Sequence, residues 1–454
     1  MNLTNHQRLT LFATSISYVV VVLDTSIVNV ALTRISQGLG VDVNGLQWIV
    51  NAYVVIFASL LLTGGALGDM FGARKIYMLG LALFTASSLL CGCAPTLPLL
   101  IAGRILQGVG ASLLVPCSLS LLTHAYPDAK ERAKAIASWA SWGGAALVLG
   151  PLAGGALLAA FDWRSIFLVN VPIGLLGIWL TLKTVSPVDN RGSRRLDLLG
   201  QMTAATAMIL VTAALIESSE YGYGDKWALG AFALAAVSAL AFVVVERKAR
   251  APMLPLFLFA NPVFSWICYI FMSGSAAFFG MLFVLSLYLQ RVAALTPLQT
   301  GVALLPLSLC VMAGNIASAR LSHRFDPMNL MFAGAAIRLV GFAGVALVNT
   351  AYSYVLIAPL LLLIGFGGGL GSPMSTSVFM STVDRQYSGI ASGVSRATGQ
   401  IGSAIGVAIF GGFVADTHQI AQGMRMSAAI SSVLTASIVL AVCYLFRLSR
   451  RAVY

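Results

Sequence analysis

The chain has 454 residues, of which 59% are hydrophobic and only 9% are charged, and its mean hydropathy is +0.91. A water-soluble domain is excluded, because its surface would lack the charged residues that keep it in water. The net charge of +12 does not indicate nucleic-acid binding, because the basic residues lie at the ends of apolar segments. The composition therefore predicts a polytopic membrane protein.

The six cysteines lie almost entirely within apolar segments, and no histidine lies close to Cys91 or Cys93. We interpret the cysteines as small buried side chains, so we expect no disulfide, no metal site and no cofactor. The sequence contains no HExxH motif, no histidine cluster and no paired carboxylates at membrane depth. It therefore does not predict an enzyme.

A scan for apolar stretches of about 20 residues predicts fourteen transmembrane helices. The segments are 9–32, 46–67, 76–95, 98–122, 134–159, 163–183, 198–217, 227–245, 263–290, 298–319, 329–349, 354–377, 388–415 and 427–446. Lys and Arg are concentrated in the loops on the same side as the N-terminus. The positive-inside rule therefore predicts a multi-pass membrane protein with both termini in the cytoplasm. We expect it in the bacterial inner membrane.

The sequence contains an internal repeat. Leu67–Phe71 corresponds to Leu321–Phe325, and Ile136–Ser138 recurs as Ile390–Ser392, with the same offset of 254 residues in both pairs. Parallel repeats about an axis along the membrane normal are a common transporter architecture. We expect an all-α membrane protein with two pseudo-symmetric six-helix bundles. Its parts are an N-terminal bundle (1–183), cytoplasmic linkers with inserted helices seven and eight (184–262), and a C-terminal bundle (263–454).

Asp24 is a single carboxylate within the apolar stretch Val19–Leu32. A charge at this depth costs about 3 kcal/mol or more, so it indicates a functional site with a partner. An apolar environment disfavours the ionised form of a carboxylate, which allows it to carry a proton. The alternative is a charge that is neutralised by a neighbouring helix and has no further role.

Arg104 lies within the fourth predicted helix. With a rise of 1.5 Å per residue, both Asp24 and Arg104 lie roughly 20 Å from the cytoplasmic face of the membrane. We therefore predict that they pair, which relieves the cost of burying either charge and tunes the proton affinity of the carboxylate. A permanent structural ion pair is the alternative.

The loop that follows the second segment combines glycines, one acid and two bases. Such a loop suits a cytoplasmic latch that makes and breaks salt bridges, although an ordinary turn with positive-inside charges is equally compatible. The predicted gating residues of this loop are Gly65, Gly68, Asp69, Gly72, Arg74 and Lys75.

The fifth segment carries small residues and a proline near its outer end. Small residues allow two helices to touch, and proline weakens the helical hydrogen bonds, so this stretch suits a pivot. Small-residue packing without motion is the alternative. The residues concerned are Gly150, Pro151, Gly154 and Gly155.

Aromatic residues of the predicted helices are candidates for an apolar substrate cavity, although lipid contact and packing are alternative roles. Arg338 near the middle of the eleventh segment is a further candidate, unless it only pairs with carbonyl groups or snorkels. The candidate substrate residues are Trp48, Tyr53, Trp139, Trp142, Phe278, Phe279, Tyr288 and Arg338. Because helices nine to fourteen carry no acid at mid-membrane, we expect neutral, monocationic or weakly acidic substrates rather than dications.

Nearly the whole chain resembles the drug:proton antiporters of the major facilitator superfamily, specifically the fourteen-helix EmrB/QacA type. The matching stretches are LDTSIVNVAL (Leu23–Leu32), GALGDMFGARK (Gly65–Lys75), GRILQGVGAS (Gly103–Ser112), GPLAGG (Gly150–Gly155) and DWRSIFLVNVPIG (Asp162–Gly174). The resemblance implies that Asp24 and Arg104 couple protons, that Asp69 and Arg74 belong to the gate, and that Gly150 and Pro151 lie in the rocking helix. Two positions depart from the pattern. The first-helix motif of the family often ends in proline, where this chain has Thr33, and the second-half copy of the gate loop has His323 at the place of the acid Asp69.

The sequence therefore predicts a proton-coupled antiporter that exports lipophilic drugs or other small toxic compounds by alternating access, driven by the proton gradient. Its expected partners are the lipophilic small molecule, protons and membrane lipid, with no nucleic acid. We expect a monomer, with or without an accessory periplasmic protein. The alternatives are a dedicated exporter of one natural product or lipid, and a facilitator on the same fold that is not coupled to protons.

Overall fold

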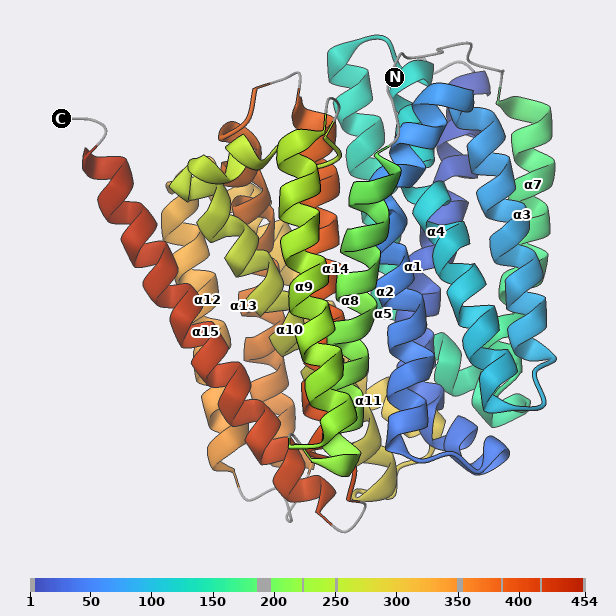
Figure 1. The fold of residues 1–454 in the computed structure, drawn as a ribbon, viewed down its shortest axis with the longest axis vertical. Helices are drawn as coiled ribbons and strands as arrows, with labels where there is room; N and C mark the ends of the chain where they lie inside the picture. Colours follow the sequence, from blue (N-terminus) through green and yellow to red (C-terminus); the bar gives the residue numbers. More distant parts are fainter. Residues whose placement is uncertain are drawn as a thin grey trace. The chain divides into compact units, whose positions relative to one another are not determined.

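The computed structural model describes residues 5–185, 197–222, 224–249, 252–348, 354–384, 387–416 and 419–451. Within these ranges every regular element is a helix (Figure 1). The helices are α1 (Asn5–Leu39), α2 (Val43–Phe71), α3 (Ala73–Gly92), α4 (Leu97–Ala125), α5 (Ala129–Ala160), α6 (Ser165–Leu168), α7 (Asn170–Thr184), α8 (Leu198–Tyr221), α9 (Lys226–Lys248), the 3-10 helix η1 (Leu256–Ala260), α10 (Pro262–Arg291), α11 (Pro297–Leu321), α12 (Pro327–Leu347), α13 (Tyr354–Ser381), α14 (Ser388–Gly412) and α15 (Ile420–Arg451).

Thirteen helical stretches among the described residues are long and apolar enough to cross a membrane, with α6 and α7 counted together. The predicted segment 388–415 forms helix α14, which is not among the thirteen. Its sequence is rich in Gly and Ser because α14 packs closely on α10. A Cβ at Gly406 would lie 2.7 Å from the Cα of Ala276. The polarity of α14 therefore reflects helix contact rather than exposure to water.

The predicted segment 163–183 is divided into α6 and α7 at Val169. Pro172 explains the division, because proline has no N–H to donate to the carbonyl of Leu168 one turn earlier. The break makes Asn170 the first residue of α7, and this side chain is fully buried. The break therefore places the polar side chain of Asn170 in the buried interior of the protein, at the start of α7.

Several helix starts are fixed by side chains that accept from the first free backbone N–H groups. Asp128, Asn261 and Asp326 cap α5, α10 and α12 in this way. At α11, Thr296 and Gln299 form a reciprocal capping box. Proline follows directly in α10, α11 and α12, where its missing N–H costs nothing.

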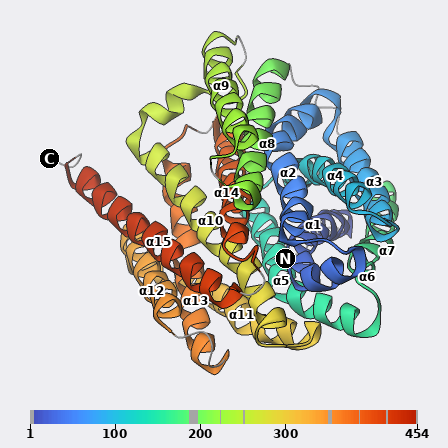
Figure 2. The same ribbon diagram turned by 60° about the horizontal axis from the view of Figure 1, so that its bottom comes forward.

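The chain is divided into two compact units. In unit 1, α1 packs against α4, α5 and α7, while α3 packs against α4 and α7 (Figure 1). In unit 2, α10 packs against α14 and α15, α12 packs against α13 and α15, and α11 packs against α13 (Figure 2). Unit 1 comprises Met1–Val41, Trp48–Leu210 and Ala233–Met253, and unit 2 comprises Asp42–Gln47, Val211–Phe232 and Leu254–Tyr454.

The stretch expected as a loop after the second segment is mostly helical. Helix α2 continues to Phe71 and α3 begins at Ala73, so only Gly72 lies outside a helix. Hydropathy marks where a helix leaves the apolar layer, whereas the helix itself continues until the backbone turns. Gly72 makes that turn with a φ of 95°, a conformation that other residues rarely adopt.

We predict that Gly72→Ala destabilises the protein by about 1–3 kcal/mol, because the Cβ strains the backbone at this positive φ. Thermal unfolding of the purified protein measures the effect. Gly144→Ala is the matched control, because a Cβ at Gly144 in α5 meets no other atom within 4 Å. Equal unfolding temperatures for the two variants would contradict the prediction.

Candidate functional site

Unit 1 contains a buried ion pair between α1 and α4. The Asp24 side chain is 0% exposed and that of Arg104 is 1% exposed. Nη1 of Arg104 donates to Oδ2 of Asp24 at 2.5 Å. The structure thus brings together the two charges that the sequence placed at the same membrane depth.

Two amide side chains complete the contacts of the carboxylate. Gln107 donates through Nε2 to Oδ1 of Asp24 at 3.4 Å, and Asn170 donates through Nδ2 to the same oxygen at 3.2 Å. Gln107 lies three residues after Arg104, on the same face of α4. Asn170 reaches the site because α7 begins there. Asp24 therefore accepts hydrogen bonds from three side chains, which come from α4 and α7.

The guanidinium of Arg104 is also held on several sides. Its Nε donates to the carbonyl of Ile49 at 3.1 Å, and its Nη1 donates to Oε1 of Gln107 at 2.9 Å. The ring of Tyr53 lies against it, with 4.3 Å between Cζ and the ring centroid. These contacts fix the cation, because a planar guanidinium uses both its donors and its face.

Gln107 extends the network into α3. Its Nε2 donates to Oγ of Ser88 at 2.8 Å, and its Oε1 accepts from Sγ of Cys91 at 3.3 Å. The site residues predicted from the sequence do not include Gln107, Asn170, Ser88 or Cys91. The spacing of three from Arg104 was an available signal for Gln107, whereas Asn170 required knowledge of the break before α7.

The arrangement has one unused acceptor. Oδ1 of Asn170 is buried and has no hydrogen-bond partner. This oxygen is therefore open to a hydrogen-bond donor, and the hydrogen-bonding capacity of Asn170 is only partly used by the described residues.

The predicted gating residues lie at the junction of α2 and α3. Arg74 donates through Nη2 to the carbonyl of Leu182 near the end of α7, at 3.2 Å. A Cβ at Gly68 would lie 2.7 Å from Sγ of Cys117, so the glycine allows α2 to approach α4. Asp69 lies in the last turn of α2. Gly65 is less constrained than Gly68, because the nearest atom to its Cβ position is 3.6 Å away, and Lys75 is exposed.

The glycines of α5 pack directly on the turn of α1 that follows Asp24. A Cβ at Gly150 would clash with Ser26, whose own Cβ is 2.8 Å away. A Cβ at Gly154 would lie 3.2 Å from the carbonyl oxygen of Ile27. Pro151 lies inside the helix, and the neighbouring Gly155 is buried. The α5 backbone therefore contacts α1 next to the ion pair.

The aromatic candidates of unit 1 occupy different environments. Tyr53 belongs to the ion-pair site described above. Trp139 is buried and stacks on Tyr18, with 3.9 Å between the ring centroids. Trp48 is partly buried, whereas Trp142 is exposed.

In unit 2, Phe278 and Phe279 contact each other edge to face at 5.2 Å, and Tyr288 is buried. Arg338 of α12 reaches α10, where its Nη2 donates to the carbonyl of Gly274 at 2.5 Å. The four predicted residues of this unit all lie on α10 and α12.

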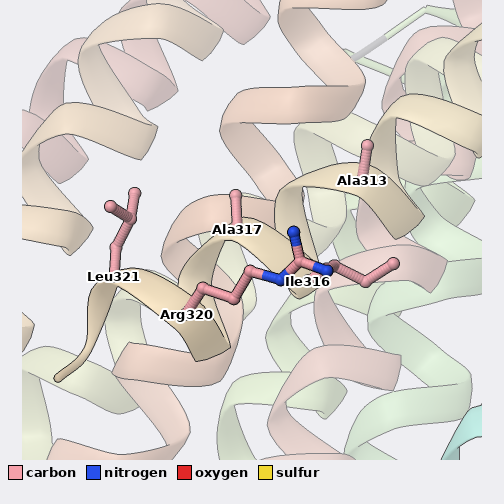
Figure 3. A pocket seen from close by; sticks show the side chains of 5 residues that line it. All are labelled: Ala313, Ile316, Ala317, Arg320 and Leu321. Carbon is pink, nitrogen blue, oxygen red and sulfur yellow. The ribbon is translucent and has the colours of Figure 1, made fainter.

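Two cavities lie apart from these side chains. The first has a volume of about 560 Å³ and is lined by α11 alone, with the Arg320 side chain extending along the helix toward Ile316 (Figure 3). Its lining residues are Ala313, Ile316, Ala317, Arg320 and Leu321. The second has a volume of about 570 Å³, and its lining from α8, α9 and their connection includes Glu217, Tyr221, Asp225 and Trp227. Neither cavity is lined by a predicted substrate residue.

Comparison with known proteins identifies relatives along most of the chain. Residues 14–407 match the family described as Major Facilitator Superfamily. The methylenomycin A resistance protein of Bacillus subtilis is 36% identical over 402 residues, which are 88% of this chain and 86% of that protein. The multidrug resistance protein Stp of Mycobacterium tuberculosis is 35% identical over 413 residues, which are 90% of this chain and 76% of that protein.

Among solved structures, the nucleoside transporter NupG aligns with a TM-score of 0.68 and 12% sequence identity. The alignment covers 95% of this chain and 99% of NupG. At this level of identity, the likeness establishes the fold alone.

We predict that Arg104→Leu destabilises the protein by about 3–5 kcal/mol, because it leaves the Asp24 carboxylate buried without its cation. The double variant Asp24→Asn/Arg104→Leu should recover part of this loss, since no bare charge remains. Thermal unfolding of the purified variants measures both effects.

The matched control is the exposed pair of Asp162 and Arg164, whose side chains are 57% and 36% exposed. Arg164→Leu should change the unfolding temperature little, because solvent screens this pair. Losses that simply add in the Asp24/Arg104 double variant would contradict a coupled buried pair.

Proposed function

The chain belongs to the Major Facilitator Superfamily, and from this premise we propose that it is a proton-coupled antiporter of the fourteen-helix drug-export type. It exports small toxic compounds across the bacterial inner membrane, with both termini in the cytoplasm. The proton gradient drives it, and no cofactor takes part. The protein acts as a monomer, with or without an accessory periplasmic protein.

The observation that carries this proposal is the buried carboxylate of Asp24 within a membrane-spanning helix. Protonation from the outer side would neutralise Asp24 and release Arg104 from its ion pair. Release of the proton to the inner side would restore the pair. Because the two protonation states differ in these contacts, the proton shifts the balance between outward-facing and inward-facing conformations.

The other motifs of the sequence take supporting roles in this proposal. Gly65, Gly68, Asp69, Gly72, Arg74 and Lys75 form the cytoplasmic gate, and Gly150, Pro151, Gly154 and Gly155 form the pivot of the rocking helix α5. The contact of Gly150 with Ser26 supports this assignment, because it joins the pivot to the α1 turn beside Asp24. The N-terminal and C-terminal bundles, 1–183 and 263–454, would move as the two rocking halves.

The names of the relatives support a toxic small compound as the substrate. One relative is named for resistance to methylenomycin A and another for multidrug resistance, so both a dedicated and a broad exporter fit the proposal. Helices α10 to α15 contain no Asp or Glu. We therefore propose substrates that are neutral or carry a single charge, rather than dications.

A facilitator on the same fold is the second candidate. The ion pair of Asp24 and Arg104 is fully buried and hydrogen-bonded, as an inert structural pair would also be. Substrate transport into proteoliposomes with and without a proton gradient separates the two functions. A facilitator moves substrate equally well in both conditions.

We predict that Asp24→Asn abolishes proton-driven efflux, because the amide keeps the shape of the carboxylate but cannot carry a proton. Substrate accumulation in everted membrane vesicles, driven by an imposed pH gradient, measures the activity. Asp162→Asn is the matched control, because it removes the acid of an exposed Asp–Arg pair and should leave transport intact.

Two further measurements make this comparison decisive. Membrane levels of both variants are compared by immunoblot, and substrate exchange without a gradient is measured in proteoliposomes. Gradient-driven efflux that persists in Asp24→Asn at wild-type levels would reject Asp24 as the proton carrier.

We predict that Asn170→Leu lowers gradient-driven transport several-fold, because the variant removes one of the three side-chain donors to the Asp24 carboxylate. Transport is measured in everted membrane vesicles at equal protein levels. Asn29→Leu is the control, because the Asn29 amide donates to the carbonyl of Thr25 within α1. Wild-type transport by Asn170→Leu would show that this contact does not contribute to the site.

A further inference from the structure

Unit 2 contains an arginine in the apolar part of its helices. Arg338 lies roughly 17 Å along α12 from Pro327, by the helical rise of 1.5 Å per residue. Helix α12 has 21 residues, so this position is near its middle. A cation at such a depth is costly, and its neighbours must provide compensation or a ligand must.

The protein provides little compensation. Arginine has five N–H donors, and one hydrogen bond is formed, from Nη2 to the carbonyl of Gly274 at 2.5 Å. The ring of Phe342 lies 5.3 Å from Cζ. The Nε atom is buried and has no partner. A buried donor without an acceptor costs about 1–3 kcal/mol, so the native fold leaves this site unsatisfied.

None of the carboxylates that the structure describes forms an ion pair with this arginine. Helices α10 to α15 contain no Asp or Glu at all. Among the residues that the structure describes, Arg104 forms an ion pair with Asp24, whereas Arg338 has no Asp or Glu within 4.0 Å. Arg338 therefore lacks the counter-charge that Arg104 has in unit 1.

The internal repeat indicates that the fold itself does not require a cation at this position. With the offset of 254 residues, Arg338 corresponds to Phe84 of the first half, which is fully buried. An apolar side chain thus fills the equivalent position of the same architecture. The arginine is a specific feature of the second half of this chain.

Glycines hold the arginine in a defined position. A Cβ at Gly367 of α13 would lie 2.6 Å from the backbone nitrogen of Arg338 and 2.9 Å from its Cβ, so the two helices touch at the base of the side chain. On the other side, a Cβ at Gly274 would lie 3.4 Å from Nη1. The guanidinium is thereby fixed between α12 and α10, with donors that are not used by the protein.

We propose that Arg338 binds the anionic group of the transported compound, so that lipophilic acids, above all carboxylates, are a preferred substrate class. A fixed guanidinium with free N–H groups matches the two oxygens of a carboxylate. The bound anion supplies the counter-charge that the helices lack. As an assignment of the transported substrate this rests on the proposed function, whereas the binding itself requires no proton coupling.

The test compares an acid with its uncharged analogue. Equilibrium binding of radiolabelled 1-naphthoate and of its methyl ester is measured on the full-length protein in nanodiscs, without a gradient. We expect the wild-type protein to bind the acid at least tenfold more tightly than the ester. Arg338→Gln should abolish this preference and keep the affinity for the ester, while Arg338→Lys should retain part of the preference.

Arg425→Gln is the matched control. Arg425 is another arginine of unit 2 that donates to a main-chain carbonyl, from Nε to Ala346 at 3.3 Å, but it is exposed. Its substitution should leave the preference for the acid unchanged. Retained affinity for the ester reports that Arg338→Gln is folded.

Several results would overturn the proposal. They are a wild-type protein that binds the acid no better than the ester, and an acid preference that persists in Arg338→Gln or is lost equally in Arg425→Gln. The comparison of acid and ester binding on the wild-type protein tests the proposal even when Arg338→Gln does not fold. Gradient-driven export by Asp24→Asn, measured in parallel, would reject the proposed proton coupling and leave the anion site standing.

Discussion

The structure of unit 1 depends on the burial of one negative charge. Asp24 is tolerated in an apolar helix because α4 supplies the guanidinium of Arg104 and the amide of Gln107, and α7 supplies the amide of Asn170. Arg104 and Gln107 are themselves held by further contacts, Arg104 by the ring of Tyr53 and Gln107 by the hydroxyl of Ser88. A change in the charge of this carboxylate therefore alters the contacts among several helices at once, rather than at one bond.

Close helix packing places this charge beside the helix that is proposed to move. Because Gly150 and Gly154 have no side chains, the α5 backbone lies against Ser26 and Ile27, within three residues of Asp24. Protein interiors transmit strain because they are densely packed. A displacement of this turn of α1 would therefore reach α5 directly, and it would need no chain of intermediate side chains.

The two halves of the repeat carry different charges. Unit 1 holds an acid with its cation, whereas α12 of unit 2 holds a cation with no acid in any helix from α10 to α15. Under the two proposals, the first half would exchange the proton and the second would recognise the charge of the substrate. This division would keep the two charges of the transport cycle on separate groups, and it would explain why Arg338 lies where the first half has Phe84.

The sequence by itself determined the membrane class, the approximate positions of most helices and the expected common depth of Asp24 and Arg104. These properties are local, since they follow from apolar run length and from the fixed rise per residue. Only the tertiary structure decided that Asn170 reaches Asp24, that Arg74 bonds to Leu182 and that Arg338 bonds to Gly274. The physical reason is that hydropathy gives the depth of a side chain along a helix, whereas its partner depends on how that helix is rotated and which helices lie beside it.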